Sequence, residues 1–144
     1  MQKFQTEDGR GFGVRTLTPI AKGQNVLEYR GELVSHDEAE HREITYKNRG
    51  DADSYMFWFQ ARKGKKTCKM CIDATETDHI SRFVNHNRKR PNLEPKLEYQ
   101  MIDGMETPQI WFRAKRSLKQ GEELLFDYGD RRKAVLEALP WLKE

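Results

Sequence analysis

The amino-acid sequence predicts a mainly β fold with short helices. Turn signals built on glycine, proline, asparagine and aspartate come often, and the regular segments between them are short. Aromatic residues make up 10% of the chain and occur throughout it, which argues against disorder. A chain of 144 residues can bury one core and is too short for two ordinary domains. We therefore expect a single domain over residues 1–144.

The N-terminal part of the chain reads as short strands separated by glycine turns. Gly9, Gly11 and Gly13 form a glycine-rich loop, and glycine allows positive φ angles and a close approach of backbone to a ligand. As a nucleotide-binding signature this loop is weak, because it is not a G-x-G-x-x-G pattern entering a helix. Strands are expected beyond it at residues 14–17, 25–30 and 32–34.

One helix is expected to begin at Ser35. Ser35 followed by Glu38 is a capping-box pattern, in which each side chain satisfies a backbone N–H of the other residue. The polar run that follows contains helix-forming residues up to about Tyr46, and the segment 50–53 ends it.

Two hairpins and a final strand and helix are expected in the second half of the chain. Lys63-Gly64-Lys65 and Asp103-Gly104 are turn sequences with β-prone residues on both sides. Asp130 is a helix-capping residue, and Pro140 limits how far that helix runs. The predicted strands lie at residues 55–60, 67–73, 96–102, 109–115 and 123–128, and the predicted helical segment lies at about 130–144.

Charge and hydropathy exclude a membrane span and leave contact with nucleic acid open. No apolar run approaches the roughly 20 residues that cross a bilayer, and the N-terminus has no signal-peptide pattern. We therefore expect a soluble, intracellular protein without membrane contact. The net charge of +3 is a mild excess, but basic residues gather at 62–66 and 88–90. These clusters are either solvated loops or contacts with DNA phosphates.

The two cysteines do not indicate a metal centre. Cys68 and Cys71 form a C-x-x-C pair on a predicted strand, where positions three apart point to opposite faces. A structural zinc site normally has four ligands, and the chain has no second cysteine pair. We therefore expect no metal, and a reducing compartment fits the absence of a disulfide framework.

Three further segments carry candidate chemistry. They are the glycine-rich loop at 10–13, the run Arg82-Phe-Val-Asn-His-Asn87, and the run EELLFDYGD at 122–130. In the last run Phe126 and Tyr128 share one face of a strand, because residues i and i+2 do so. Each segment alone has a structural interpretation: a turn, a satisfied Asn–His pair, or core aromatics beside a hairpin end.

Their combination resembles the SET domain of protein lysine methyltransferases, whose hallmarks are N-H-S-type and E-E-L-x-x-D-Y-type segments. The chain has NHN and EELLFDYGD in the same order. Further segments are similar to the group that monomethylates lysine twenty of histone H4, and they read EYRGEL, SYMFWF, CIDAT, RPNL and PWLK. The resemblance covers residues 10–143. It implies small curled sheets and a C-terminal pseudoknot, an exception to the rule against threaded chains.

The resemblance implies transfer of methyl groups from S-adenosylmethionine to the ε-amine of a lysine in a protein tail. Histone H4 is the expected substrate, as a tail peptide or within a nucleosome, and the product is mono- or dimethyllysine with S-adenosylhomocysteine. It also implies a monomer that acts on chromatin in the nucleus.

The resemblance further implies roles for individual residues. Tyr128 is the expected catalytic tyrosine, and Tyr29 lines the lysine channel. Trp141 stacks on the adenine, and Tyr55 meets the carboxylate end of the cofactor. Asn85 and His86 hold its adenosine and methionine portions. The complete set of expected cofactor-binding residues is Arg10, Gly11, Phe12, Tyr55, Asn85, His86 and Trp141.

Two expected channel residues depart from the monomethylating group. Phe126 stands where that group has a tyrosine whose hydroxyl anchors a water molecule in the space of a second methyl. Trp58 stands where a channel tyrosine is expected, and its larger ring would narrow the channel. The two changes act in opposite directions, and our hypothesis is that the protein can dimethylate.

Three alternatives remain at this stage. A catalytically weak SET domain would bind a lysine-containing tail as a reader. A basic domain would bind nucleic acid without any effect of the cofactor. A third alternative keeps the enzyme and changes its target to a non-histone lysine.

Overall fold

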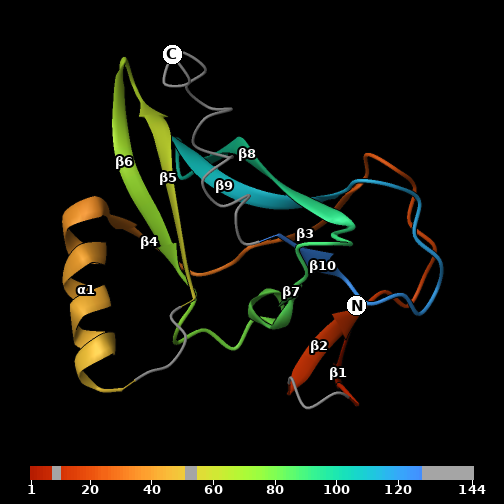
Figure 1. Cartoon of the computed structure of the whole chain (residues 1–144). Coiled ribbons are helices and arrows are strands. Elements are labelled where there is room, and N and C mark those ends of the chain that lie inside the picture. The colour runs from red at the N-terminus through yellow and green to blue at the C-terminus, as the bar shows by residue number, and fades with distance from the viewer. Residues whose placement is uncertain (8–10, 51–54, 128–144) are drawn as a thin grey trace.

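The computed structural model describes residues 1–7, 11–50 and 55–127. In these ranges the chain forms three small sheets, one α-helix and one short 3₁₀ helix (Figure 1). This confirms the prediction of a mainly β fold. Among the described helices, none has the length and apolar character that crossing a membrane requires. The predicted helical segment at 130–144 lies outside the described residues.

The three sheets are built from ten strands of the described chain. A two-stranded antiparallel sheet pairs β1 (Gln2–Gln5) with β2 (Phe12–Arg15). A three-stranded antiparallel sheet has the order β4 (Glu32–Ser35), β6 (Lys66–Asp73), β5 (Met56–Lys63). The largest sheet has the order β3 (Asn25–Glu28), β9 (Met105–Ala114), β8 (Leu93–Ile102), β10 (Leu125–Phe126), β7 (Asn85–His86).

Helix α1 (His36–Asn48) begins where the capping pattern predicts. The Ser35 hydroxyl accepts a hydrogen bond from the Glu38 N–H at 3.2 Å, an interaction that stabilises a helix by about 1 kcal/mol. The helix buries Ala39 and Tyr46 against one face of the β4–β6–β5 sheet. That face is thereby separated from the main core on the other side of the sheet.

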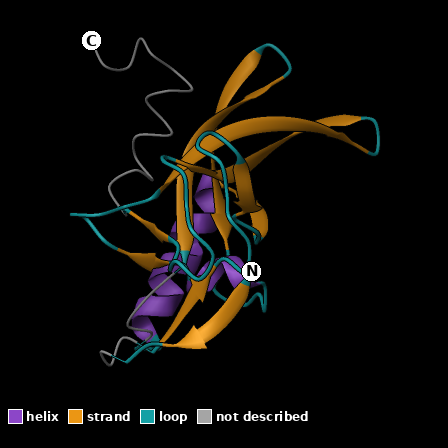
Figure 2. Ribbon diagram, turned by 90° about the vertical axis from the view of Figure 1, so that its right-hand side faces the viewer, coloured by secondary structure: helices purple, strands orange, loops and turns teal. Residues whose placement is uncertain are grey.

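Both predicted hairpins form, and both are longer than the sequence predicts. In the β8–β9 hairpin, Asp103 and Gly104 have φ angles of 51° and 77°, as a type I′ turn requires. Strand β8 begins at Leu93 rather than at residue 96. Pro95 lies in the ladder opposite Phe112, although proline has no N–H with which to donate a backbone hydrogen bond. Figure 2 shows the two hairpins projecting from the body of the molecule.

The main core lies between the large sheet and the three-stranded sheet. Its largest fully buried side chains include Phe57 from β5 and Phe112 from β9. Removal of such a ring in a packed core costs about 3–5 kcal/mol. Gly31 connects β3 to β4 beside this core, and an added Cβ there would lie 2.5 Å from the Asp73 carbonyl oxygen. Only glycine fits at this position, since backbone cannot give way.

The C-terminal strand β10 lies between β7 and β8 and runs parallel to both. Asn92 fixes this crossing, because its side chain accepts from the Leu125 N–H and donates to the Glu123 carbonyl, each at 2.8 Å. The Asn92 N–H donates to the Leu125 carbonyl at 2.9 Å. Residues 87–92 join β7 to β8 across β10, which is the arrangement that the predicted pseudoknot requires. Within the described part of the predicted strand 123–128, which ends at residue 127, Leu125 and Phe126 form the strand.

Candidate functional site

The N-terminal loop and the Asn85 segment meet at one junction. The Asn85 Nδ2 donates to the Phe12 carbonyl at 2.9 Å and to Glu123 Oε2 at 3.1 Å. Gly13 makes this approach possible, because an added Cβ would lie 2.6 Å from Glu123 Oε2 and 3.1 Å from Asn85 Nδ2. Gly11, directly before β2, has a φ angle of 93°. Gly11, Phe12 and Asn85, which were expected to bind one ligand, are therefore brought together.

Aromatic rings and cations form one side of this junction. The Phe12 ring is 45% exposed and meets the edge of Phe83 at 6.0 Å between centroids. The Arg82 guanidinium lies 4.7 Å from the Tyr55 ring and 5.1 Å from the Phe83 ring, distances typical of cation–π contacts. Tyr55 is thus connected to the Phe12–Asn85 junction through Arg82 and Phe83.

Arg82 has a hydrogen-bonding capacity that its described neighbours leave in part unused. Its Nη1 donates to the carbonyl oxygens of Thr75 and Thr77 at 3.0 and 2.8 Å. Its Nε is buried and has no hydrogen-bond partner within the described ranges. A buried charged donor without a partner is costly, so a bound acceptor such as a carboxylate would satisfy it.

His86 and Phe126 are opposite each other in the parallel pairing of β7 with β10. His86 Nδ1 lies 3.9 Å from Asp127 Oδ1, which is beyond hydrogen-bond distance. The Asn87 N–H donates to the Phe126 carbonyl at 3.0 Å. The crossing therefore places the NHN segment directly beside the Phe126 strand.

Tyr29 and Phe126 line a buried aromatic cluster. The Phe112 ring lies between them, 6.0 Å from Tyr29 and 4.8 Å from Phe126 between centroids, and Phe57 lies 5.6 Å from Tyr29. Tyr29 is only 4% exposed and Phe126 only 3%. Such apolar surroundings disfavour charged groups and lower the pKa of an amine that enters them.

Trp58 lies apart from this cluster and from Tyr29, with which it was expected to share a channel. Phe57 and Phe59 of β5 face the main core, whereas Trp58 packs against the cluster beneath α1. Its ring lies 5.4 Å from His36, the first residue of that helix. The alternation of a β-strand explains the difference, because neighbouring residues point to opposite faces.

Three expected site residues lie outside the described residues. They are Arg10, Tyr128 and Trp141. The other expected residues, apart from Trp58, fall into two connected groups. One is the junction and the other is the aromatic cluster, and together they contain Gly11, Phe12, Tyr29, Tyr55, Asn85, His86 and Phe126.

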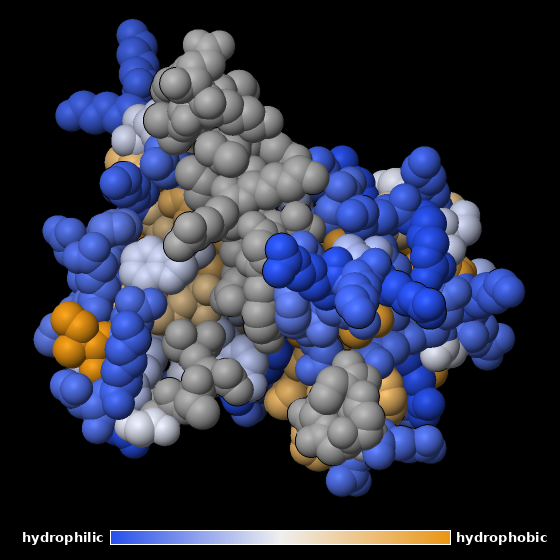
Figure 3. All heavy atoms as spheres, in the orientation of Figure 1, coloured by the Kyte–Doolittle hydropathy of each residue, from blue (hydrophilic) through white to orange (hydrophobic). Residues whose placement is uncertain are grey.

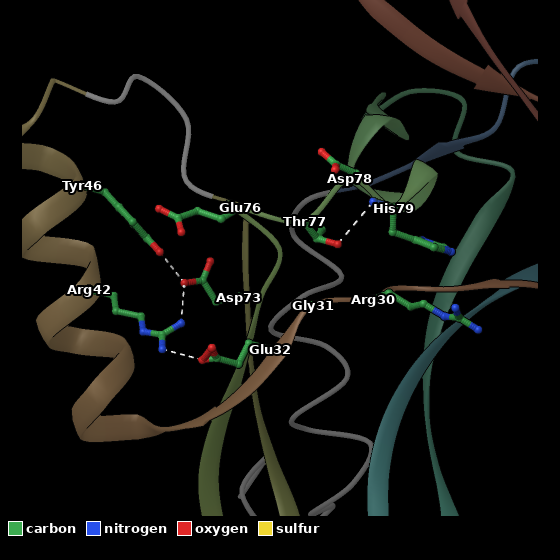
Figure 4. A pocket seen from close by; sticks show the side chains of 10 residues that line it. All are labelled: Arg30, Gly31, Glu32, Arg42, Tyr46, Asp73, Glu76, Thr77, Asp78 and His79. Atoms are coloured by element: carbon green, nitrogen blue, oxygen red, sulfur yellow. Dashed lines mark hydrogen bonds and ion pairs between the residues drawn. The ribbon is translucent and has the colours of Figure 1, made fainter.

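A cavity of the described chain lies elsewhere, between α1 and residues 73–79 (Figure 4). Its volume is about 670 Å³, and none of the expected site residues that the structure describes lines it. Asp73 accepts hydrogen bonds from the Tyr46 hydroxyl at 2.5 Å and from Arg42 Nη1 at 3.2 Å. Burial alone would raise the pKa of Asp73, but hydrogen bonds from Thr75, Tyr46 and Arg42 outweigh it and lower the pKa. These paired charges have a structural role.

The described residues offer little for a metal. Cys71 is buried, and burial, followed by the charge of Asp73, raises the pKa of its thiol to about 12. Such a thiol is a poor ligand, because the thiolate binds metal. His36, Asp37 and Glu40 have possible ligand atoms within 4.8 Å of one another, but both carboxylates are exposed on the first turns of α1. Acidic residues are ordinary there, since they complement the helix dipole.

Sequence reasoning missed three residues that build the site. Glu123 holds the Asn85 amide, Arg82 stacks between two aromatic rings, and Asn92 fixes the crossing strand. Each acts on a partner far away in the chain, so local patterns contain no signal for it. The EEL and RPNL segments marked Glu123 and Asn92 only as parts of a resemblance.

Comparison with known proteins gives consistent matches. The SET domain family matches residues 11–129. N-lysine methyltransferase KMT5A-A of Danio rerio is 42% identical over 94% of this chain and 37% of its own length. Histone-lysine N-methyltransferase set-1 of Caenorhabditis elegans is 40% identical over 92% of this chain and 52% of its own length. The chain thus spans about half or less of the length of these relatives.

A solved structure shares the fold. The crystal structure of CpSET8 from Cryptosporidium superposes with a TM-score of 0.71 at 37% sequence identity. The match covers 88% of this chain and 56% of that chain.

Proposed function

Because the chain belongs to the SET-domain family, we propose that it transfers methyl groups from S-adenosylmethionine to the ε-amine of a lysine in a protein tail. The observation that supports this most is the junction of the glycine-rich loop with the NHN segment, beside the buried aromatic cluster of Tyr29 and Phe126. We also propose that residues 1–144 fold as one domain with a helical segment at about 130–144.

The residues at the junction fit the cofactor. Arg82 offers a buried donor for its carboxylate beside Tyr55, and the exposed Phe12 ring offers an apolar face. Asn85 and His86 form β7, the edge strand of the large sheet, where their backbone and side chains would hold the remaining polar groups of the cofactor. Gly11 and Phe12 would contribute backbone contacts, and Arg10 and Trp141 complete the proposed set. None of the proposed contacts involves a metal.

The proposed chemistry needs a neutral amine and good alignment. When bound, S-adenosylmethionine would supply a methyl group on a positively charged sulfur; the nitrogen of the neutral amine would bond to that methyl carbon as the carbon–sulfur bond breaks, and S-adenosylhomocysteine would leave as a neutral thioether. A free lysine has a pKa of about 10.4 and is charged at neutral pH. The rings of Tyr29, Phe112 and Phe126 disfavour the charged form, so the ammonium releases its proton to water before transfer. Tyr128 is proposed to touch the reacting groups, and the site as a whole supplies alignment.

Phe126 is proposed to allow a second methyl transfer. Its ring is buried against Phe112 and carries no hydroxyl. It therefore cannot anchor a water molecule by hydrogen bonding in the space that a second methyl group needs. A monomethylated amine can then turn and react again, and the proposed product is dimethyllysine.

The proposed substrate is the tail of histone H4, as a peptide or in a nucleosome. The names of two relatives support a histone substrate. These relatives are set-1 of Caenorhabditis elegans and SUV39H1 of Xenopus laevis, and each is named a histone-lysine N-methyltransferase. A monomer that acts on chromatin in the nucleus, with basic loops touching nucleosomal DNA, completes the proposal. A non-histone lysine is the alternative target.

Two measurements test the proposal. Calorimetric titration should show binding of S-adenosylmethionine, and methyl transfer should appear on one core histone when histones and nucleosomes are offered in parallel. Mapping of the modified lysine then identifies the target. Tail binding without cofactor binding would instead favour a reader domain.

A further inference from the structure

Four lysines at the free end of the β5–β6 hairpin have no ion-pair partner within the described ranges. These exposed residues are Lys63, Lys65, Lys66 and Lys69. Their neighbour Arg62 differs, because its Nε lies 3.0 Å from Glu106 Oε1 and its guanidinium lies 4.4 Å from the Tyr99 ring. The fold therefore uses one cation of the group and leaves four to solvent.

The fold gains nothing from this arrangement. Lys63 and Lys66 are direct cross-strand partners, and like charges in that position are destabilising. Residues 62–69 contain five cations and no carboxylate. The turn itself needs only Gly64, whose φ angle is 63°. A charge cluster that costs stability at the tip of a hairpin calls for a partner outside the chain.

The hairpin tip is hydrogen-bonded to the β8–β9 hairpin and lies far from the proposed methyl-transfer site. The Arg62 N–H donates to the Tyr99 hydroxyl at 2.9 Å, which ties the tip to the β8–β9 hairpin. Strand β5 has eight residues, so the tip is about 25 Å from Tyr55 at its start. Figure 1 shows the tip at one end of the molecule, away from β7 and β10, and Figure 3 shows hydrophilic side chains projecting there.

We propose that the β5–β6 hairpin tip, defined by Lys63, Lys65, Lys66 and Lys69, binds the phosphate backbone of double-stranded DNA. Lysines that replace counterions on phosphates give affinity without sequence preference. The choice of DNA among polyanions rests on the proposed function, in which the target lysine belongs to a nucleosome. The pair Lys63 and Lys66 would lose its mutual repulsion when phosphates lie over it.

The second basic cluster, at residues 88–90, is a weaker candidate for a separate DNA site. Asn87 Oδ1 accepts from the N–H groups of Lys89 and Arg90 at 3.0 and 2.8 Å, which forms a tight turn directly after His86. That turn adjoins the proposed cofactor site. Its cations therefore serve substrate and cofactor as readily as DNA, whereas the hairpin tip has no such second role.

The test compares two variants with equal loss of charge. Lys63→Gln, Lys65→Gln and Lys66→Gln remove the tip cations together. Lys22→Gln, Lys115→Gln and Lys119→Gln remove three exposed lysines from the loops before β3 and after β9. Binding to a short mixed-sequence DNA duplex is measured by fluorescence anisotropy over a series of salt concentrations, without cofactor. Thermal melting of both variants verifies folding.

The expected result is specific to the tip. If all three lysines contact phosphates, the slope of log affinity against log salt becomes shallower by about 2.7 in the tip variant. The control variant keeps the wild-type slope. Methylation of a free peptide stays unchanged in the tip variant, while the KM for nucleosomes rises.

Other outcomes overturn the proposal. Equal slopes for wild type and tip variant exclude phosphate contact, and equal losses in both variants show only an effect of net charge. Loss of binding to anionic phosphatidylserine vesicles, with DNA binding intact, would assign the tip to a membrane surface. If the tip variant behaves as expected but no protein substrate is methylated, the proposed function fails and the DNA site stands.

Discussion

Replacement of Gly13 by alanine tests the junction on which the proposed cofactor site depends. Gly13 lies on β2, and its Cα faces the Glu123 carboxylate and the Asn85 amide. An added Cβ would lie 2.6 Å from Glu123 Oε2, a separation that real Cβ atoms essentially never show. The carboxylate has to move, whereas the Phe12 carbonyl on the neighbouring residue need not.

The size of the effect follows from the contact that is lost. Displacement of the Glu123 carboxylate breaks its 3.1 Å hydrogen bond with Asn85, and a hydrogen bond to a charged group contributes about 1.5–3 kcal/mol. The loss of glycine flexibility in the unfolded chain offsets about 0.4–1 kcal/mol of this in the free energy of unfolding. Cofactor affinity has no such offset and falls by roughly ten- to 150-fold if Asn85 must be held for the cofactor to bind.

Calorimetric titration with S-adenosylmethionine measures this loss, and thermal melting separates it from general unfolding. The matched control is the double variant Gly13→Ala with Glu123→Ala, in which the obstructing carboxylate is absent. Because the two residues touch, the effects of the single changes should not add. Wild-type cofactor affinity for Gly13→Ala, or strictly additive effects, would refute the role assigned to this junction.

Three other changes have defined outcomes. Phe126→Tyr should restrict the product to monomethyllysine in a peptide mass assay. The control Trp58→Phe, on the other face of β5 from Phe57, should leave the product unchanged. Dimethylation by Phe126→Tyr would contradict the proposal that Phe126 allows the second methyl transfer. Asp73→Asn should lower the free energy of unfolding by about 2–4 kcal/mol, because it weakens two or three hydrogen bonds to a buried charge. Since folding lowers the pKa of Asp73, this stability is present above the unfolded pKa of about 3.9 and is lost as pH falls through the lower folded value. The gap between wild type and Asp73→Asn in urea titrations should therefore close below pH ~4, and a constant gap contradicts it. Arg82→Lys should weaken cofactor binding more than it weakens folding, because lysine keeps the charge but not the planar donors, and equal losses would assign Arg82 a purely structural role.

Local patterns in the sequence predict the elements well where neighbouring residues determine them. The Ser35 cap starts α1, and Asp103-Gly104 turns the β8–β9 hairpin with the φ angles that its sequence requires. Strand β1 has no comparable signal, because its four residues are stabilised by pairing with β2.

Long-range contacts account for what the sequence does not predict. Glu123 reaches Asn85, 38 positions away, only because β10 crosses between β7 and β8. Trp58 was placed in the channel by resemblance, although the alternation of β5 already sets it on the opposite face from Phe57 and Phe59. The alternation along one strand thus determines the face on which each side chain lies, whereas the passage of β10 between β7 and β8 determines which distant segments come into contact.

The transfer of methyl groups to lysine is tested by a time course of intact-mass spectra for a histone H4 tail peptide incubated with the protein and S-adenosylmethionine. The peptide should gain one methyl group and then a second on the same lysine. If protein that melts cooperatively adds no mass to the peptide, to histones or to nucleosomes, this chain does not transfer methyl groups to lysine.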